Sequence, residues 1–247
     1  HENLLETTHI GLVSLIVLLG SILPSIVGFG VGIITTPFLL LVLDPVSVVV
    51  TLNSVGIILY GSIAVKTRSH FPVQDMIPMI IAGIIGIPVG VLMLDMASAS
   101  TLRIGISILL IILTLCTGIK VKVNKTYHNI LSPLIGFTTG VLLTGAGVGG
   151  PLIAVYLVAL KWPKDAVRSS IAFFTSIKSI FSIIGYGIAG FYTHDNILLS
   201  ILIIIPVLIG VTAGDMITKK LSDHTFHQIV IWMILVASFI VLLKEIF

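Results

Sequence analysis

Long apolar stretches are the feature of this sequence that most limits its fold. The stretches 46–65, 76–94, 104–119 and 197–217 approach the roughly 20 residues that a helix needs to cross a bilayer. Of 247 residues, 57% are hydrophobic and 9% are charged, about a third of the charged share of a soluble domain. Because the stretches are continuous rather than alternating, they do not fit the strands of a membrane β-barrel. The sequence therefore predicts an all-α polytopic membrane protein.

The sequence also repeats itself. The motif at 30–32 returns at 147–149, the glycine pattern at 85–90 is matched at 209–214, and Tyr60-Gly61 is matched by Tyr186-Gly187. We predict a first repeat over residues 1–122 and a second over 123–247, divided near the lysine-rich stretch 120–128. Each repeat should hold a glycine-tipped helical hairpin and three transmembrane helices. The predicted hairpins are 10–43 and 130–160, and the predicted helices are 46–65, 74–95, 101–119, 167–190, 197–218 and 224–243.

Loop charges indicate how each hairpin lies in the membrane. The second leg of the first hairpin, residues 33–43, would be about 16 Å of helix, too short for a core of about 30 Å. The two legs therefore either dip in and return or make one broken crossing. If they return, ten loop charges share one side and only Arg103 and Lys244 lie opposite; a single crossing splits the same twelve charges evenly. Basic loops gather in the cytoplasm, which favours the returning hairpin. The ten are Lys66, Arg68, Lys120, Lys122, Lys125, Lys161, Lys164, Arg168, Lys219 and Lys220.

A returning hairpin followed by three crossings fixes the relation between the repeats. The number of crossings per repeat is then odd, so the second repeat is inverted, with hairpins entering from opposite faces and their tips meeting near the midplane. Inverted repeats with interrupted helices are common in secondary transporters. The prediction is a multi-pass protein of the plasma membrane, with both termini outside and the Lys/Arg loops cytoplasmic.

The hairpin tips are candidate anion sites. Each tip is rich in glycine and ends where a helix should start, and free amides at a helix start attract oxyanions. Pro151 suits the first turn of such a helix. The alternative is that these glycines only let helices pack closely. The tip candidates are Gly28, Phe29, Gly30, Val31 and Gly32 in the first repeat and Gly147, Val148, Gly149, Gly150 and Pro151 in the second.

Lys178 is the second candidate feature. It lies in the middle of an apolar run, where a lysine costs at least about 2.5 kcal/mol on insertion scales, and its run contains no acidic residue. A bound anion would compensate that charge, whereas the alternative is a lysine that reaches the membrane surface or a backbone carbonyl. Further polar residues could bind the anion or join helices: Thr51, Asn53, Ser54, Ser169, Ser170, Thr175, Ser176 and Ser179.

The sequence has no motif typical of a metal carrier, a zinc site or an enzyme. No carboxylate cluster falls at membrane depth, the histidines have no zinc spacing, and no nucleophile, base and acid combine. We therefore expect no metal, no cofactor, no enzymatic activity and no nucleic acid partner. The expected partners are a small anion and the lipid bilayer, and a homo-oligomer is also possible.

The glycine motifs resemble those of the sulfite exporter TauE/SafE family. The first tip, followed by Pro37, is similar to the family's glycine-rich opening. Residues 147–151, followed by Tyr156, are similar to its second glycine motif, and Lys178 takes the place of its basic residue after the second hairpin. The resemblance implies transport, usually export, of small sulfur-containing anions such as sulfite or organosulfonates. Our hypothesis is a secondary transporter that works by alternating access around two opposed hairpins. An anion channel and a non-transporting scaffold subunit are the alternatives.

Overall fold

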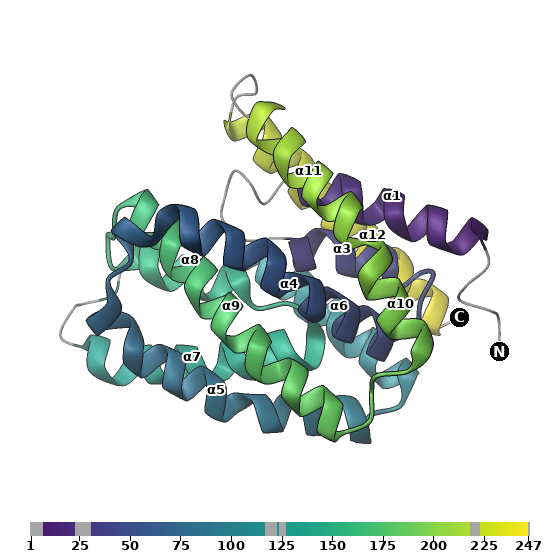
Figure 1. Ribbon diagram of the computed structural model, residues 1–247, viewed down its shortest axis with the longest axis horizontal. Helices are drawn as coiled ribbons and strands as arrows, with labels where there is room; N and C mark the ends of the chain where they lie inside the picture. The colour runs from purple at the N-terminus through teal and green to yellow at the C-terminus, as the bar shows by residue number, and fades with distance from the viewer. Residues whose placement is uncertain (1–6, 23–30, 117–122, 124–126, 218–222, 247) are drawn as a thin grey trace.

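The computed structural model describes residues 7–22, 31–116, 123, 127–217 and 223–246, and every regular element in these ranges is a helix (Figure 1). Six helical segments within them are long and apolar enough to cross a membrane, which confirms the all-α polytopic prediction. The elements are α1 (Thr7–Ile22), α3 (Val31–Leu39), α4 (Pro45–Thr67), the short turn η1 (Arg68–His70), α5 (Val73–Met96), α6 (Ala99–Cys116), α7 (His128–Ala146), α8 (Gly150–Ala159), α9 (Lys164–Ile188), α10 (His194–Leu202), α11 (Ile204–Ile217) and α12 (Asp223–Ile246).

Local sequence signals explain where several helices begin. Asp44 caps α4 by accepting a hydrogen bond from the backbone N–H of Ser47 at 2.9 Å, and Pro45 occupies the first turn. Thr193 caps α10 through the N–H of Asn196 in the same way. These caps fix where α4 and α10 begin.

The predicted helix 197–218 is divided in the structure into two helices. α10 ends at Leu202 and α11 begins at Ile204. Pro206 has no N–H to donate to the carbonyl four residues earlier, at Leu202, so the helical ladder is interrupted there. The two pieces together still form one span, His194–Ala213.

Matching helices of the two halves run antiparallel to each other. α4 packs along α9, and the Ser169 hydroxyl at the start of α9 donates to the Thr67 carbonyl at the end of α4 (3.0 Å). α6 packs along α12, and Arg103 near the start of α6 pairs with Glu245 at the end of α12 (3.5 Å). Antiparallel matching helices are what inversion of the second repeat would give.

The other contacts also recur between corresponding helices of the two halves. α7 packs on α5, and its counterpart α1 packs on α11, the counterpart of α5. The pairs α3 with α12 and α8 with α6 are related in the same way. The contacts of the first half thus recur between the corresponding helices of the second half.

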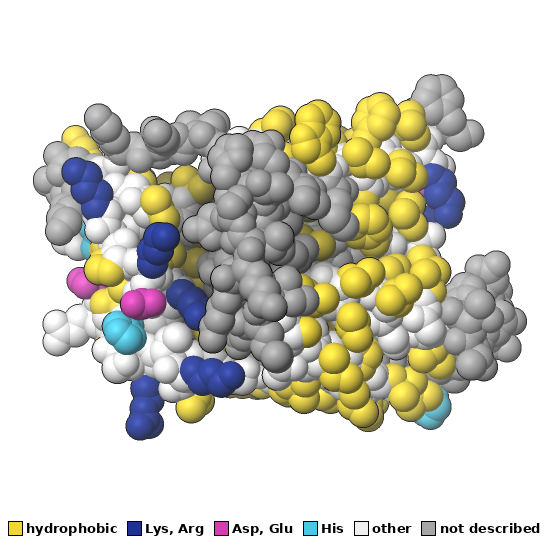
Figure 2. Space-filling view, turned by 90° about the horizontal axis from the view of Figure 1, so that it is seen from above, with side chains coloured by type: hydrophobic (Ala, Val, Ile, Leu, Met, Phe, Trp, Pro, Cys, Tyr) yellow, Lys and Arg dark blue, Asp and Glu magenta, His cyan; other side chains and the backbone are white. Residues whose placement is uncertain are grey.

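Charge is sorted along the molecule. The ends of α4 and α8 and the start of α9 carry Lys66, Arg68, Lys161, Lys164 and Arg168. We call this the basic end. Figure 2 shows most of the dark-blue side chains at the left end of the view and yellow, hydrophobic side chains over much of its right half. Arg103 and Lys244 lie at the opposite end, near the start of α4, where Lys244 reaches the carbonyl of Leu41. The described residues are thus distributed as a cytoplasmic basic end would require.

Glycines allow α5 and α7 to pack closely. A Cβ at Gly136 would overlap the carbonyl of Met79, and one at Gly140 would overlap the carbonyl of Gly83. We expect Gly136→Ala to destabilise the protein by about 1–3 kcal/mol and to lower its melting temperature in detergent by about 2 °C or more. Gly105→Ala is the matched control, because a Cβ there meets nothing within 4 Å. Equal melting of the two variants would contradict this packing.

Candidate functional site

The second hairpin turns back inside the molecule. α7 ends with Gly147 in the left-handed conformation (φ 69°), which favours glycine. A Cβ at Gly149 would lie 3.2 Å from the Thr139 side chain, two turns back along α7. The glycines therefore carry the chain back before α8 starts, and α8 begins beside the middle of α7.

α8 then returns to the end where α7 began. The phenol of Tyr156 in α8 lies 2.9 Å from Nδ1 of His128 at the start of α7. The Trp162 ring, just beyond α8, lies 6.4 Å from the His128 ring. The left-handed Gly147 and the glycines that follow it thus let one long and one short leg form a returning hairpin.

The two hairpins touch at their glycine motifs. α3 starts at Val31, and a Cβ on Gly32 would overlap the carbonyl oxygen of Gly147. Gly147 in turn faces Thr36 of α3 and Val49 of α4. The candidates Gly28, Phe29 and Gly30 lie outside the described residues. Contact this close requires glycine at position 32.

Two small cavities adjoin this contact. The larger has a volume of about 40 Å³, above the roughly 10–15 Å³ that a cavity needs to hold one water. The smaller measures about 20 Å³. Both are bordered by Gly32, Tyr60, Leu143, Gly147 and Thr175. The larger one adds Val31, Leu52, Asn53, Val55, Gly56, Leu59, Ser179 and Val207, and the smaller one Ile33, Val148, Gly149, Gly150 and Pro151.

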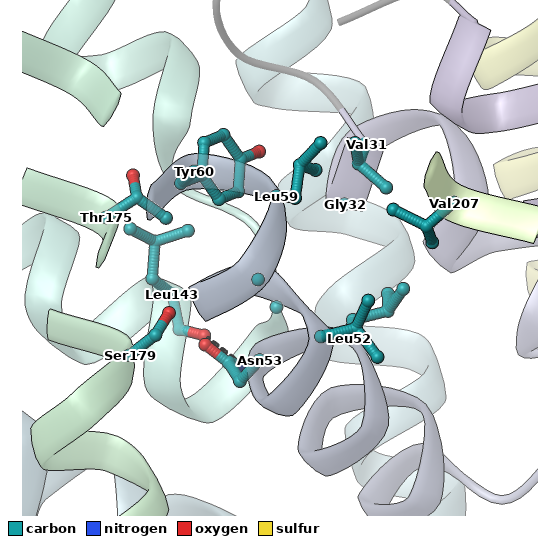
Figure 3. Close-up of a pocket in the computed structure, with 13 residues that line it drawn as sticks. Val31, Gly32, Leu52, Asn53, Leu59, Tyr60, Leu143, Thr175, Ser179 and Val207 are labelled. Atoms are coloured by element: carbon teal, nitrogen blue, oxygen red, sulfur yellow. Dashed lines mark hydrogen bonds between the residues drawn. The ribbon is translucent and has the colours of Figure 1, made fainter. Parts of the chain in front are cut away.

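Figure 3 shows how the helices surround the larger cavity. Thr175 and Ser179 of α9 lie on one side, Val31 and Val207 lie on the other, and α4 passes between them with Asn53. Ser179 Oγ is buried without a hydrogen-bond partner in the described structure. The cavity therefore offers a hydroxyl that is not bonded to the protein.

Lys178 lies directly behind Asn53. Its side chain is 1% exposed, and its ammonium donates to Oδ1 of Asn53. The Asn53 amide nitrogen donates to the carbonyls of Val49 (2.8 Å) and Leu143 (3.0 Å), and Figure 3 marks the second bond. The buried polar side chains of the described residues include Lys178 but no Asp or Glu. Within that part of the chain the ammonium thus has an amide oxygen as its partner and no counter-ion.

Side chains also bind the last carbonyls of α7. The carbonyls at a helix end carry partial negative charge, which would repel an anion. Asn53 donates to Leu143, and the Tyr186 phenol donates to Thr144 at 2.7 Å. These bonds reduce the partial negative charge at the end of α7. The start of α8, with its partial positive charge, lies beside the smaller cavity.

The other predicted polar residues lie away from the cavities. Ser169 bonds Thr67 at the basic end, and Ser54 bonds the Tyr192 phenol at 2.8 Å. Thr51 and Ser170 are buried but line neither cavity. The bonds of Ser169 and Ser54 fit the alternative of helix-to-helix hydrogen bonding, whereas the hydroxyls of Thr51 and Ser170 have no hydrogen-bond partner in the described structure. Sequence reasoning did not select Tyr60 or Tyr186 for the site, although their matched positions in the two repeats were a usable signal.

Comparison with known proteins gives the family. The sequence profile described as sulfite exporter TauE/SafE matches residues 13–241. The chain belongs to this family. No curated protein and no solved structure matches it. Membership in TauE/SafE makes the chain a multi-pass membrane transporter of sulfite or related anions, with lipid and a small anion as its partners. In the described part of this TauE/SafE chain, no group of three His, Cys, Asp or Glu side chains could hold a metal.

Proposed function

We propose that this TauE/SafE chain is a secondary transporter that exports small sulfur-containing anions such as sulfite or organosulfonates, by alternating access around the two hairpin tips. The observation that carries the proposal is the contact between Gly32 and Gly147 beside a small cavity backed by Lys178. In this proposal the basic end faces the cytoplasm and both termini face outside.

The electrostatics of the cavity favour an anion. Lys178 lies behind Asn53 without a buried carboxylate in the described structure. The start of α8 adds the partial positive charge of a helix N-terminus. Hydroxyls of Thr175 and Ser179 stand at the cavity wall and can donate to anion oxygens. On anion binding, the Lys178 ammonium would turn from the Asn53 oxygen toward the anion.

Alternating access fits the way the tips are built. In this proposal each hairpin enters from its own end, and the two meet where Gly32 contacts Gly147, with no side chain between them. Movement of one half against the other would open the cavity to one end at a time, as in transporters built from inverted repeats. An open pore through the tips would need both hairpins to part together, which disfavours the channel alternative.

The proposal is tested by flux into proteoliposomes that contain the purified chain. We expect saturable uptake of sulfite or of a small organosulfonate and no comparable movement of monovalent cations. Voltage-driven currents that do not saturate would indicate the channel alternative instead. Absence of flux for sulfite, thiosulfate and several organosulfonates in folded protein would refute anion transport.

A further inference from the structure

We propose that the outer half of the substrate passage runs along one face of α9, formed by Thr175, Ser179, Ser182 and Tyr186. We call these residues the outer stripe, where outer means away from the basic end. The inference rests on the proposed function, because it assigns the route by which the anion leaves the cavity.

The spacing of the outer stripe forms a continuous path. Its members are four, three and four residues apart, which places them on one helix face. From Thr175 to Tyr186 the stripe covers roughly 16 Å and ends within a turn of the last helical residue, Ile188. All four side chains are buried, whereas Ile180, Ile184 and Ile188 on the opposite face are exposed. The hydroxyls therefore point into the protein and the apolar residues toward lipid.

The hydrogen bonds of the stripe are incomplete. Ser182 bonds the Thr144 hydroxyl at 3.0 Å, but Ser179 Oγ has no partner in the described structure and borders the cavity. An unpaired hydroxyl at membrane depth is unfavourable. Other buried hydroxyls of the described residues also lack a partner, but of these Ser179 is the one that borders a cavity at the hairpin contact. A passage for an oxyanion or water would give this hydroxyl its partner.

The inner half of the same helix differs. Ile171 and Phe174 are almost fully buried, and they belong to an apolar cluster with Ile153 and Leu157 of α8. Ser169 and Ser170 are buried in this half of α9 but lie off the face that carries Thr175, where Ile171 and Ala172 occupy the preceding turn. On that face, apolar side chains therefore line the inner side and hydroxyls line the outer side.

Tyr186 closes the stripe. Its phenol donates to the Thr144 carbonyl at 2.7 Å, and its ring packs on Phe191 with centroids 6.1 Å apart. Beyond it, Asn196 bonds the Phe191 carbonyl and the Ser47 hydroxyl. We infer that Tyr186 must move before the anion can pass outward.

Cysteine labelling tests the route, since Cys116 is the single cysteine of the chain and can be replaced by alanine. In that background, Ser182→Cys should react with a charged, membrane-impermeant thiosulfonate added at the outer face. Ile184→Cys is the control at similar depth on the lipid side, and Lys164→Cys identifies the basic face. Because only a water-exposed thiol ionises readily, we expect Ser182→Cys to react about tenfold faster than Ile184→Cys or more. Sulfite is left out, because it attacks the reagent.

A second variant tests the gate. Tyr186→Phe keeps the ring and removes the bond to the Thr144 carbonyl, so labelling of Ser182→Cys should accelerate about fivefold, the shift expected from one lost hydrogen bond. Reaction of Ser182→Cys no faster than Ile184→Cys, or from the basic face alone, would overturn the passage. Labelling needs no transported substrate. Labelling without anion flux would therefore refute only the proposed function, and flux without labelling would refute only this route.

Discussion

Replacing Lys178 by methionine is expected to weaken anion transport about 10- to 100-fold, because a charge-assisted hydrogen bond contributes about 1.5–3 kcal/mol and each 1.4 kcal/mol is a factor of ten. The protein should nevertheless be no less stable. A lysine at membrane depth costs at least about 2.5 kcal/mol to insert, which offsets the lost bond to Asn53. Transport and stability should therefore separate in this variant. The measurements are the concentration dependence of flux and the melting temperature in detergent.

Lys164→Met is the matched control for this experiment. Lys164 lies on the same helix, is exposed, and stands at the basic end away from the cavities. It should transport like the wild type. Wild-type anion affinity in folded Lys178→Met protein would show that the lysine serves packing and not the substrate.

Gly32→Ala should impair transport more than it impairs folding. A Cβ at position 32 would overlap the Gly147 carbonyl, so the two tips would have to separate. Overpacking of this kind costs about 1–3 kcal/mol, and here the strain falls on the cavity wall itself. We expect flux to drop at least about fivefold, as that energy would give. Flux and melting temperature of the same preparation provide the comparison.

Gly11→Ala controls for the loss of a glycine elsewhere in the first hairpin. A Cβ at position 11 meets nothing within 4 Å, so this variant should keep its flux. If Gly32→Ala transports as well as Gly11→Ala does, the close contact between the tips is not needed for transport.

The sequence predicts the membrane helices well because their signal is local. Each helix needs only its own apolar run. Asp44 as the cap and Pro45 in the first turn fix the start of α4 without any other segment. The break at Ile203 was also visible, since Pro206 stands inside the predicted helix 197–218. Hydropathy alone does not show this break, because both pieces are apolar.

The site is predictable in its parts but not in its connections. Lys178 and Asn53 are recognisable as polar residues at membrane depth, yet their contact depends on the antiparallel packing of α4 on α9. A phenol that reaches a carbonyl on another helix leaves no sequence pattern, so the bond from Tyr186 to Thr144 needed the structure. The same is true of the fold-back at Gly149, which sets where α8 begins.

The most direct test of the central claim is an anomalous difference map from crystals soaked with selenite, a heavier analogue of sulfite. The account predicts a selenium peak in the larger cavity beside the Gly32–Gly147 contact, next to Asn53 and Thr175 and within reach of Lys178. Absence of a peak there, at a selenite concentration that saturates transport, would contradict it.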